Sequence, residues 1–136
     1  MLRISREQRE TAGEPAFVER LMAHLLRYYL ESMDDLPDEV LRGRVRHGLA
    51  RGRAYGLTWE YSLTVFVAHM LRINPEFDRQ PAIQRELSDP YCAPDLRIDR
   101  LAARVTAAEW EEAARRGDPG AYWRRVDAAA ERSEEP

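Results

Sequence analysis

The chain has 136 residues, 44% of them hydrophobic, and a net charge of −3, which is typical of a single globular domain. All 21 basic residues are arginine, and the small negative net charge argues against a nucleic-acid-binding protein. Cys92 is the single cysteine, so an internal disulfide is excluded and a reducing, cytoplasmic compartment is expected.

The first 13 residues alternate charged and polar side chains, so we expect a loosely attached segment and no signal peptide. Glu14 and Pro15 open the first predicted helix, because proline is tolerated in the first turn. Apolar residues then recur at three- and four-residue steps as far as Met33, and a break follows at residues 34–37. No stretch of the sequence reaches the ~20 apolar residues that a membrane span needs.

A second helix is predicted from Asp38 to Tyr55, and its acidic start is favoured by the helix dipole. Gly48 and Gly52 lie four residues apart on or beside its apolar stripe. Because glycine costs about 1 kcal/mol relative to alanine in a helix, the pair suggests that another helix backbone approaches closely there. A tolerated pair in a well-packed domain is the alternative. Gly56 has the position of a left-handed C-terminal stop.

The segment from Trp59 to Ile73 is apolar on nearly every side, which predicts a central helix buried by its neighbours. Thr58 is the expected N-cap. A strand over residues 62–68 is the alternative, because β-branched and aromatic residues are dense there. We prefer the helix because the segment is long and capped, and because the sequence offers no convincing second strand for it to pair with.

The second half of the chain also has helical patterns, interrupted by proline-rich loops. A short helix is predicted at 82–88 and a fourth main helix at about 95–105. Thr106 and Glu109 have the spacing of a capping box, which predicts a new helix or a kinked continuation. A last helix at 121–131 follows a Gly-Asp-Pro-Gly break.

The expected fold is therefore all-α, a single domain over residues 14–131 with five or six helices and a central hydrophobic helix at about 59–73. A polar N-terminal segment at 1–13 precedes this domain, and a polar tail at 132–136 follows it.

The sequence contains no recognisable catalytic or metal site. His24, His47 and His69 fall one per helix, without the close spacing of metal ligands. Cys92 lies in a proline-bracketed loop without an adjacent histidine that could act as a base. We therefore expect no catalytic residue, no metal and no cofactor, and a protein that is not an enzyme. An enzyme would need a cleft that gathers His24, His69, Cys92 or the Phe77–Asp78 loop.

The second predicted helix carries two rows of arginines and no acid beyond its first turn. Arg42, Arg46 and Arg53 project within about 40° of one another, and Arg44 and Arg51 lie on roughly the opposite side. These cations could pair with acids on neighbouring helices, receive an acidic segment of a partner, or bind nucleic acid. A helix-turn-helix is disfavoured because the following helix is too apolar to read a DNA groove.

Large aromatic residues mark the last two predicted helices, which are otherwise rich in alanine. Such residues could anchor the helices on the body of the domain, or they could form an interface hot spot. The candidate partner-binding residues are therefore Arg42, Arg46, Arg53, Trp110, Tyr122 and Trp123.

A set of short motifs occurs in a characteristic order: Leu2–Gln8, Arg46-His47-Gly48, Arg53–Glu60, Phe77-Asp78 and Arg97-Ile98-x-x-Leu101. Together they resemble a family of short helical proteins associated with bacterial type VI secretion and PAAR-type toxin gene clusters. The resemblance covers about residues 1–105. The chain departs from the family pattern at Trp59 and Tyr61, which are bulkier than usual, and the segment after Thr106 has no counterpart.

The resemblance implies a non-enzymatic accessory protein, namely an adaptor, chaperone or co-effector that binds a secreted toxin, another effector or a secretion component. It carries no catalytic residues over to this chain. An immunity-type inhibitor of a toxin is one alternative, and a nucleic-acid-binding regulator, whose binding would fall steeply with salt, is another. We expect a cytoplasmic protein, or one exported with its partner, and no membrane association. The oligomeric state stays open.

Overall fold

The computed structural model describes residues 6–29 and 35–134, and the side chains of 14–29 and 35–132. Within these residues there are seven α-helices, one 3₁₀ turn and no strand, which confirms the all-α fold. In chain order the elements are α1 (Arg6–Tyr28), α3 (Asp38–Ala54), α4 (Glu60–Arg72), η1 (Phe77–Arg79), α5 (Pro81–Leu87), α6 (Pro94–Arg104), α7 (Ala107–Ala114) and α8 (Pro119–Glu134).

The expected count of five or six helices was too low, because α7 is separate from α6. Val105 and Thr106 are extended, and the predicted capping box is complete, with both the Thr106 and the Glu109 side chains bonded to backbone N–H groups. The extended pair ends α6, and the capping box starts α7 in a new direction.

Helix α1 begins earlier than expected. It starts at Arg6, so residues 6–13 of the predicted loose segment are helical and Pro15 lies inside the helix. Proline inside a helix removes one backbone hydrogen bond, a cost that the buried apolar face of α1 offsets. The helix ends at Tyr28. The predicted end at Met33 lies outside the described residues, and so do residues 1–5 and 135–136.

Helices α3 and α4 form the centre of the fold. Gly56 ends α3 with a φ of 90°, as a left-handed stop requires. A Cβ atom built on Gly48 would lie 3.0 Å from Cγ2 of Val67, and one built on Gly52 would lie 3.0 Å from Cδ2 of Leu63. The two glycines therefore pack tightly against α4, but the nearest atoms belong to its side chains and not to its backbone, as the sequence had suggested.

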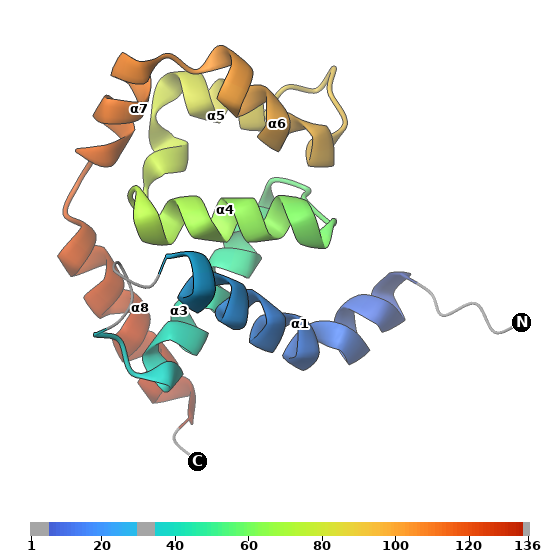
Figure 1. Ribbon diagram of the computed structural model, residues 1–136, viewed down its shortest axis with the longest axis vertical. Helices are drawn as coiled ribbons and strands as arrows, with labels where there is room; N and C mark the ends of the chain where they lie inside the picture. Colours follow the sequence, from blue (N-terminus) through green and yellow to red (C-terminus); the bar gives the residue numbers. More distant parts are fainter. Residues whose placement is uncertain (1–5, 30–34, 135–136) are drawn as a thin grey trace, which may run out of the picture.

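Helix α4 is helical as predicted, so the strand alternative at 62–68 is wrong. It lies between α1 and the α5–α6 pair, with α3 behind it (Figure 1). Its buried residues are Ser62, Leu63, Phe66, Val67, Ala68 and Met70. The expected full enclosure is wrong at the N-terminal end, where Trp59 is 54% and Tyr61 59% exposed. The N-cap is Trp59, because Thr58 is bonded to α6.

The remaining helices are arranged around this centre. Helices α5 and α6 pack together above α4, and α8 descends beside α3 (Figure 1). The buried Asn74 joins α7 to the end of α4, since its amide nitrogen donates to the carbonyls of Ala114 and Arg116. In the part of the chain that the structure describes, every helix is too short or too polar to cross a bilayer.

Candidate functional site

A chain of hydrogen-bonded side chains connects α3 with η1 and α8. His47, Arg51 and Tyr55 lie four residues apart, on one face of α3. Nε2 of His47 lies 2.6 Å from the hydroxyl of Tyr122 in α8, and Nη1 of Arg51 donates to the same hydroxyl at 3.0 Å. Nη2 of Arg51 and the hydroxyl of Tyr55 both donate to Oδ2 of Asp78 in η1. We call these five residues the polar chain.

Burial and charge set the protonation of the polar chain. Asp78 is fully buried, and in the described structure its Oδ1 has no hydrogen-bond partner. Burial, together with the hydrogen bond to Asp78, raises the pKa of Tyr55 to about 12. Burial lowers the pKa of His47, and the Arg51 charge lowers it further. His47 is therefore neutral at pH 7, and Tyr55 keeps its hydrogen.

The donor and acceptor roles follow from these protonation states. Nη1 of Arg51 donates to the oxygen of Tyr122, and in one tautomer of the neutral His47 the Tyr122 hydroxyl donates to Nε2. The imidazole then carries its own hydrogen on Nδ1. The hydrogen bonds of the polar chain thus join three elements, α3, η1 and α8, and leave Oδ1 of Asp78 as its buried atom without a partner.

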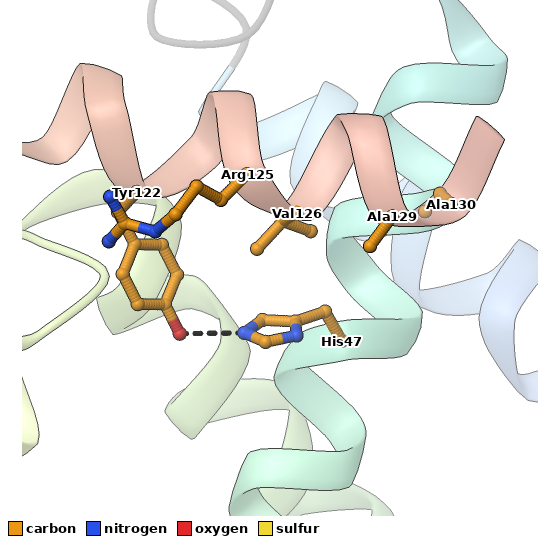
Figure 2. Close-up of a pocket in the computed structure, with 7 residues that line it drawn as sticks. His47, Tyr122, Arg125, Val126, Ala129 and Ala130 are labelled. Carbon is orange, nitrogen blue, oxygen red and sulfur yellow. Dashed lines mark hydrogen bonds between the residues drawn. The ribbon is translucent and has the colours of Figure 1, made fainter. Parts of the chain in front are cut away.

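A pocket of about 480 Å³ opens between α3 and α8, beside the His47 end of the polar chain. Figure 2 shows Val126 and Ala129 of α8 facing the His47 ring, while the Tyr122 hydroxyl points at the imidazole. The remaining lining residues are Gly43, Arg125 and Ala130. The lining is mostly apolar and small, so the pocket can accept an aliphatic group. No cluster of three or more potential metal ligands occurs in the described residues.

The predicted arginine row of α3 is largely engaged with α1. Nε of Arg42 donates to Glu19 at 2.8 Å, and the guanidinium of Arg53 donates to both carboxylate oxygens of Glu14 at 2.9 and 2.7 Å. Arg46 is exposed. Two of these three candidate partner-binding residues thus pair with acids of a neighbouring helix, which was the alternative to a partner surface.

The predicted aromatic residues lie mainly against the body of the protein. Trp123 is only 7% exposed, and the guanidinium of Arg44 lies 5.0 Å from its ring centre while bonding both oxygens of Asp127. Trp110 is partly buried against the imidazole of His69, with ring centres 5.3 Å apart. Tyr122 belongs to the polar chain. These side chains therefore anchor α7 and α8.

The sequence analysis did not predict that the side chains of Trp59 and Tyr61, at the start of the central helix α4, would be exposed. Trp59 and Tyr61 are exposed at the start of α4, and Leu96 is exposed on α6. The hydroxyl of Tyr61 donates to Oδ1 of Asp99 at 3.1 Å and links the two helices. We call Trp59, Tyr61 and Leu96 the α4–α6 aromatic surface. No periodic signal in the sequence marks this exposure, because the segment is apolar on nearly every side.

Asp95 fixes the backbone beneath this surface. Its side chain, 8% exposed, accepts hydrogen bonds at 2.8 Å from the Thr58 N–H, the Thr58 hydroxyl and the Trp59 N–H. The Ser62 hydroxyl donates to the Asp95 carbonyl at 3.0 Å. Burial opposes the ionisation of Asp95, but the hydrogen bonds together outweigh it and lower its pKa. The start of α4 is therefore held rigidly against α6.

Comparisons with models of known families, with curated proteins and with solved structures gave no significant match. Function is therefore inferred from the residues and their geometry.

Proposed function

We propose that this protein is a non-enzymatic accessory protein, acting as an adaptor, chaperone or co-effector for a secreted effector protein. The observation that carries the proposal is the exposure of Trp59 and Tyr61, 54% and 59%, at the start of a helix that Asp95 holds in place. Tryptophan and tyrosine are enriched among the residues that dominate binding energy at interfaces. A rigid backbone lowers the entropy lost when such side chains bind a partner.

The other chemistry of the protein supports a binding role over catalysis. The members of the polar chain bond to one another, apart from Oδ1 of Asp78, and Arg42 and Arg53 are paired with carboxylates of α1. The side chains of Trp59, Tyr61 and Leu96 are exposed, and within the described residues their one side-chain hydrogen bond is that of Tyr61 to Asp99. It is therefore the surface that we assign to the partner protein.

The test is affinity purification of the tagged protein from its native host, with partners identified by mass spectrometry. A Trp59→Ala/Tyr61→Ala variant is compared with the wild type and with Tyr28→Ala, a control in which the replaced residue is 60% exposed on α1. We expect one partner to be recovered with the wild type and the control, and to be lost with the double variant. Thermal melting of all three proteins checks that they are folded.

Recovery of the same partner with the double variant would show that another surface is used. Failure to recover any partner would argue against the accessory role itself. Co-expression with the identified partner then separates two kinds of accessory protein: an adaptor changes the loading or secretion of the effector, whereas rescue of the cells from toxicity would indicate an immunity-type inhibitor instead.

A further inference from the structure

We propose that the pocket between α3 and α8 binds a small aliphatic monocarboxylate, with its chain along the alanines of α8 and its carboxylate at Arg125 and the His47–Tyr122 pair. The inference goes beyond the accessory role and does not depend on it, because no residue of the α4–α6 aromatic surface lines this pocket. It is supported by the arrangement of the lining, by an unused hydrogen-bond donor and by the charge of the lining.

The pocket is polar at one end and apolar at the other. Tyr122, Arg125 and Ala129 lie at helical spacing on one face of α8 and span about 10 Å of the helix axis. Figure 2 shows the Arg125 guanidinium beside the Tyr122 ring at one end, and Ala129 and Ala130 at the other. The guanidinium carbon lies 5.9 Å from the centre of the Tyr122 ring. Such a lining suits a ligand with one polar end and one aliphatic end.

The His47–Tyr122 pair has one polar hydrogen without an acceptor. A neutral imidazole and a phenol carry one such hydrogen each, and one hydrogen bond of 2.6 Å joins Nε2 to the hydroxyl oxygen. If Tyr122 donates in this bond, the N–H at Nδ1 of His47 has no acceptor among the described residues. If His47 donates, the Tyr122 O–H has none, because the other neighbour of its oxygen is the donor Nη1 of Arg51. Either tautomer therefore offers a donor to a ligand.

The charge of the lining is positive. Arg125 is exposed, and within the described residues its guanidinium contacts the Tyr122 ring and forms no ion pair. None of the described residues that line the pocket is acidic. Burial, and then the charge of Arg51, lower the pKa of His47, so the Arg51 charge also acts at this end of the pocket. A carboxylate supplies a negative charge and acceptor oxygens, and a guanidinium binds it through two parallel hydrogen bonds.

The size of the pocket favours a small molecule. Its volume of about 480 Å³ lies in the range of small-molecule sites, roughly 300–1,000 Å³, which are mostly apolar with a few polar groups that fix orientation. The apolar end is lined by the side chains of Val126, Ala129 and Ala130. Because the lining extends over two turns of α8, a straight chain of medium length matches it, and octanoate is the probe that we choose.

The experiment is isothermal titration calorimetry of the full-length protein with octanoate below its micelle-forming concentration. Octanol has the chain without the charge, and acetate has the charge without the chain. We expect octanoate to bind at one site, and the other two ligands to bind at least tenfold more weakly. Arg125→Gln should raise the Kd for octanoate about tenfold, because the charged contact is lost. Ala129→Leu, which fills the apolar end, should abolish binding.

Arg124→Gln is the matched control, because Arg124 is an exposed arginine of α8 that lies outside the lining, and it should leave the Kd unchanged. Arg125 and Ala129 are exposed, so their variants should melt at the temperature of the wild type. Equal affinity for octanoate and octanol, or for the wild type and Arg125→Gln, would overturn the inference, as would the absence of saturable octanoate binding.

A peptide with a C-terminal leucine is the last ligand to compare. If it bound more tightly than octanoate, the occupant would be the end of a protein chain and the inference would be overturned. The result is separate from that of the purification experiment, since the Trp59→Ala/Tyr61→Ala variant should bind octanoate with the Kd of the wild type.

Discussion

Replacing Asp95 by alanine should lower the free energy of unfolding by about 2–4 kcal/mol. The substitution leaves the N–H groups of Thr58 and Trp59 and the Thr58 hydroxyl without their acceptor. Each buried donor left unsatisfied costs about 1–3 kcal/mol. Water can reach the exposed side of Trp59 and offset part of the sum. For a chain of this length, the loss corresponds to a fall in melting temperature of about 7–14 °C.

The assay is urea denaturation together with hydrogen exchange of the backbone amides. Asp99→Ala is the matched control, because it removes an exposed carboxylate one turn further along α6 that accepts one bond from Tyr61. This control should change the stability by no more than about 0.5 kcal/mol. In Asp95→Ala the amides of Thr58 and Trp59 should exchange faster. If Asp95→Ala were as stable as the control, the role assigned to Asp95 would be refuted.

Three further predictions concern the core, the polar chain and pH. Gly52→Ala should lower the free energy of unfolding by about 1–2 kcal/mol, because its Cβ would lie 3.0 Å from Cδ2 of the buried Leu63 and the overpacking outweighs the gain in helix propensity. Gly43→Ala is the control. Its Cβ would lie 3.5 Å from Ala130, so this variant should have a higher melting temperature than the wild type. Tyr122→Phe should lower the free energy of unfolding, measured by urea denaturation, by about 1–2 kcal/mol, because His47 and Arg51 both lose a hydrogen-bond partner. Tyr91→Phe, which changes a residue on the open surface, should leave the free energy of unfolding unchanged. Burial, reinforced by Arg72, lowers the pKa of His69 to about 4 from 6.5, so between these pH values the unfolded chain binds a proton that the folded chain does not. The free energy of unfolding should therefore decrease on acidification from pH 7 to pH 5, and the decrease should be about 2 kcal/mol larger in the wild type than in His69→Gln. Equal decreases in the two proteins would contradict the lowered pKa of His69.

Local signals predicted much of the helical framework. The acidic start of α3, its glycine stop at Gly56 and the capping box at Thr106 depend on residues within one helical turn of each other, and all three occur in the structure. The glycine pair of α3 predicted the close packing of α4, because small residues at helical spacing mark one face. The start of α1 was predicted wrongly, because proline is typical of a first helical turn and here Pro15 lies inside a helix that begins at Arg6.

The candidate site depends on contacts that the sequence does not mark. Asp95 reaches Thr58 across 37 residues, and Arg51 reaches Tyr122 across 71. An aspartate in the first turn of a helix is already explained by the helix dipole, so nothing in the sequence indicated that Asp95 also caps α4. Similarly, a helix that is apolar on all sides gives no periodic signal for the side that stays exposed. The exposure of Trp59 and Tyr61 could be found only after the neighbouring helices were placed.

Several hydrogen bonds of this protein give a structural reason for its use of arginine in place of lysine. Arg97 donates to three backbone carbonyls, and Arg44 and Arg53 each bond both oxygens of a carboxylate. Such forked contacts need the planar guanidinium, which a lysine ammonium cannot replace. Because these arginines serve as cross-links between helices, their charge is neutralised or directed inward.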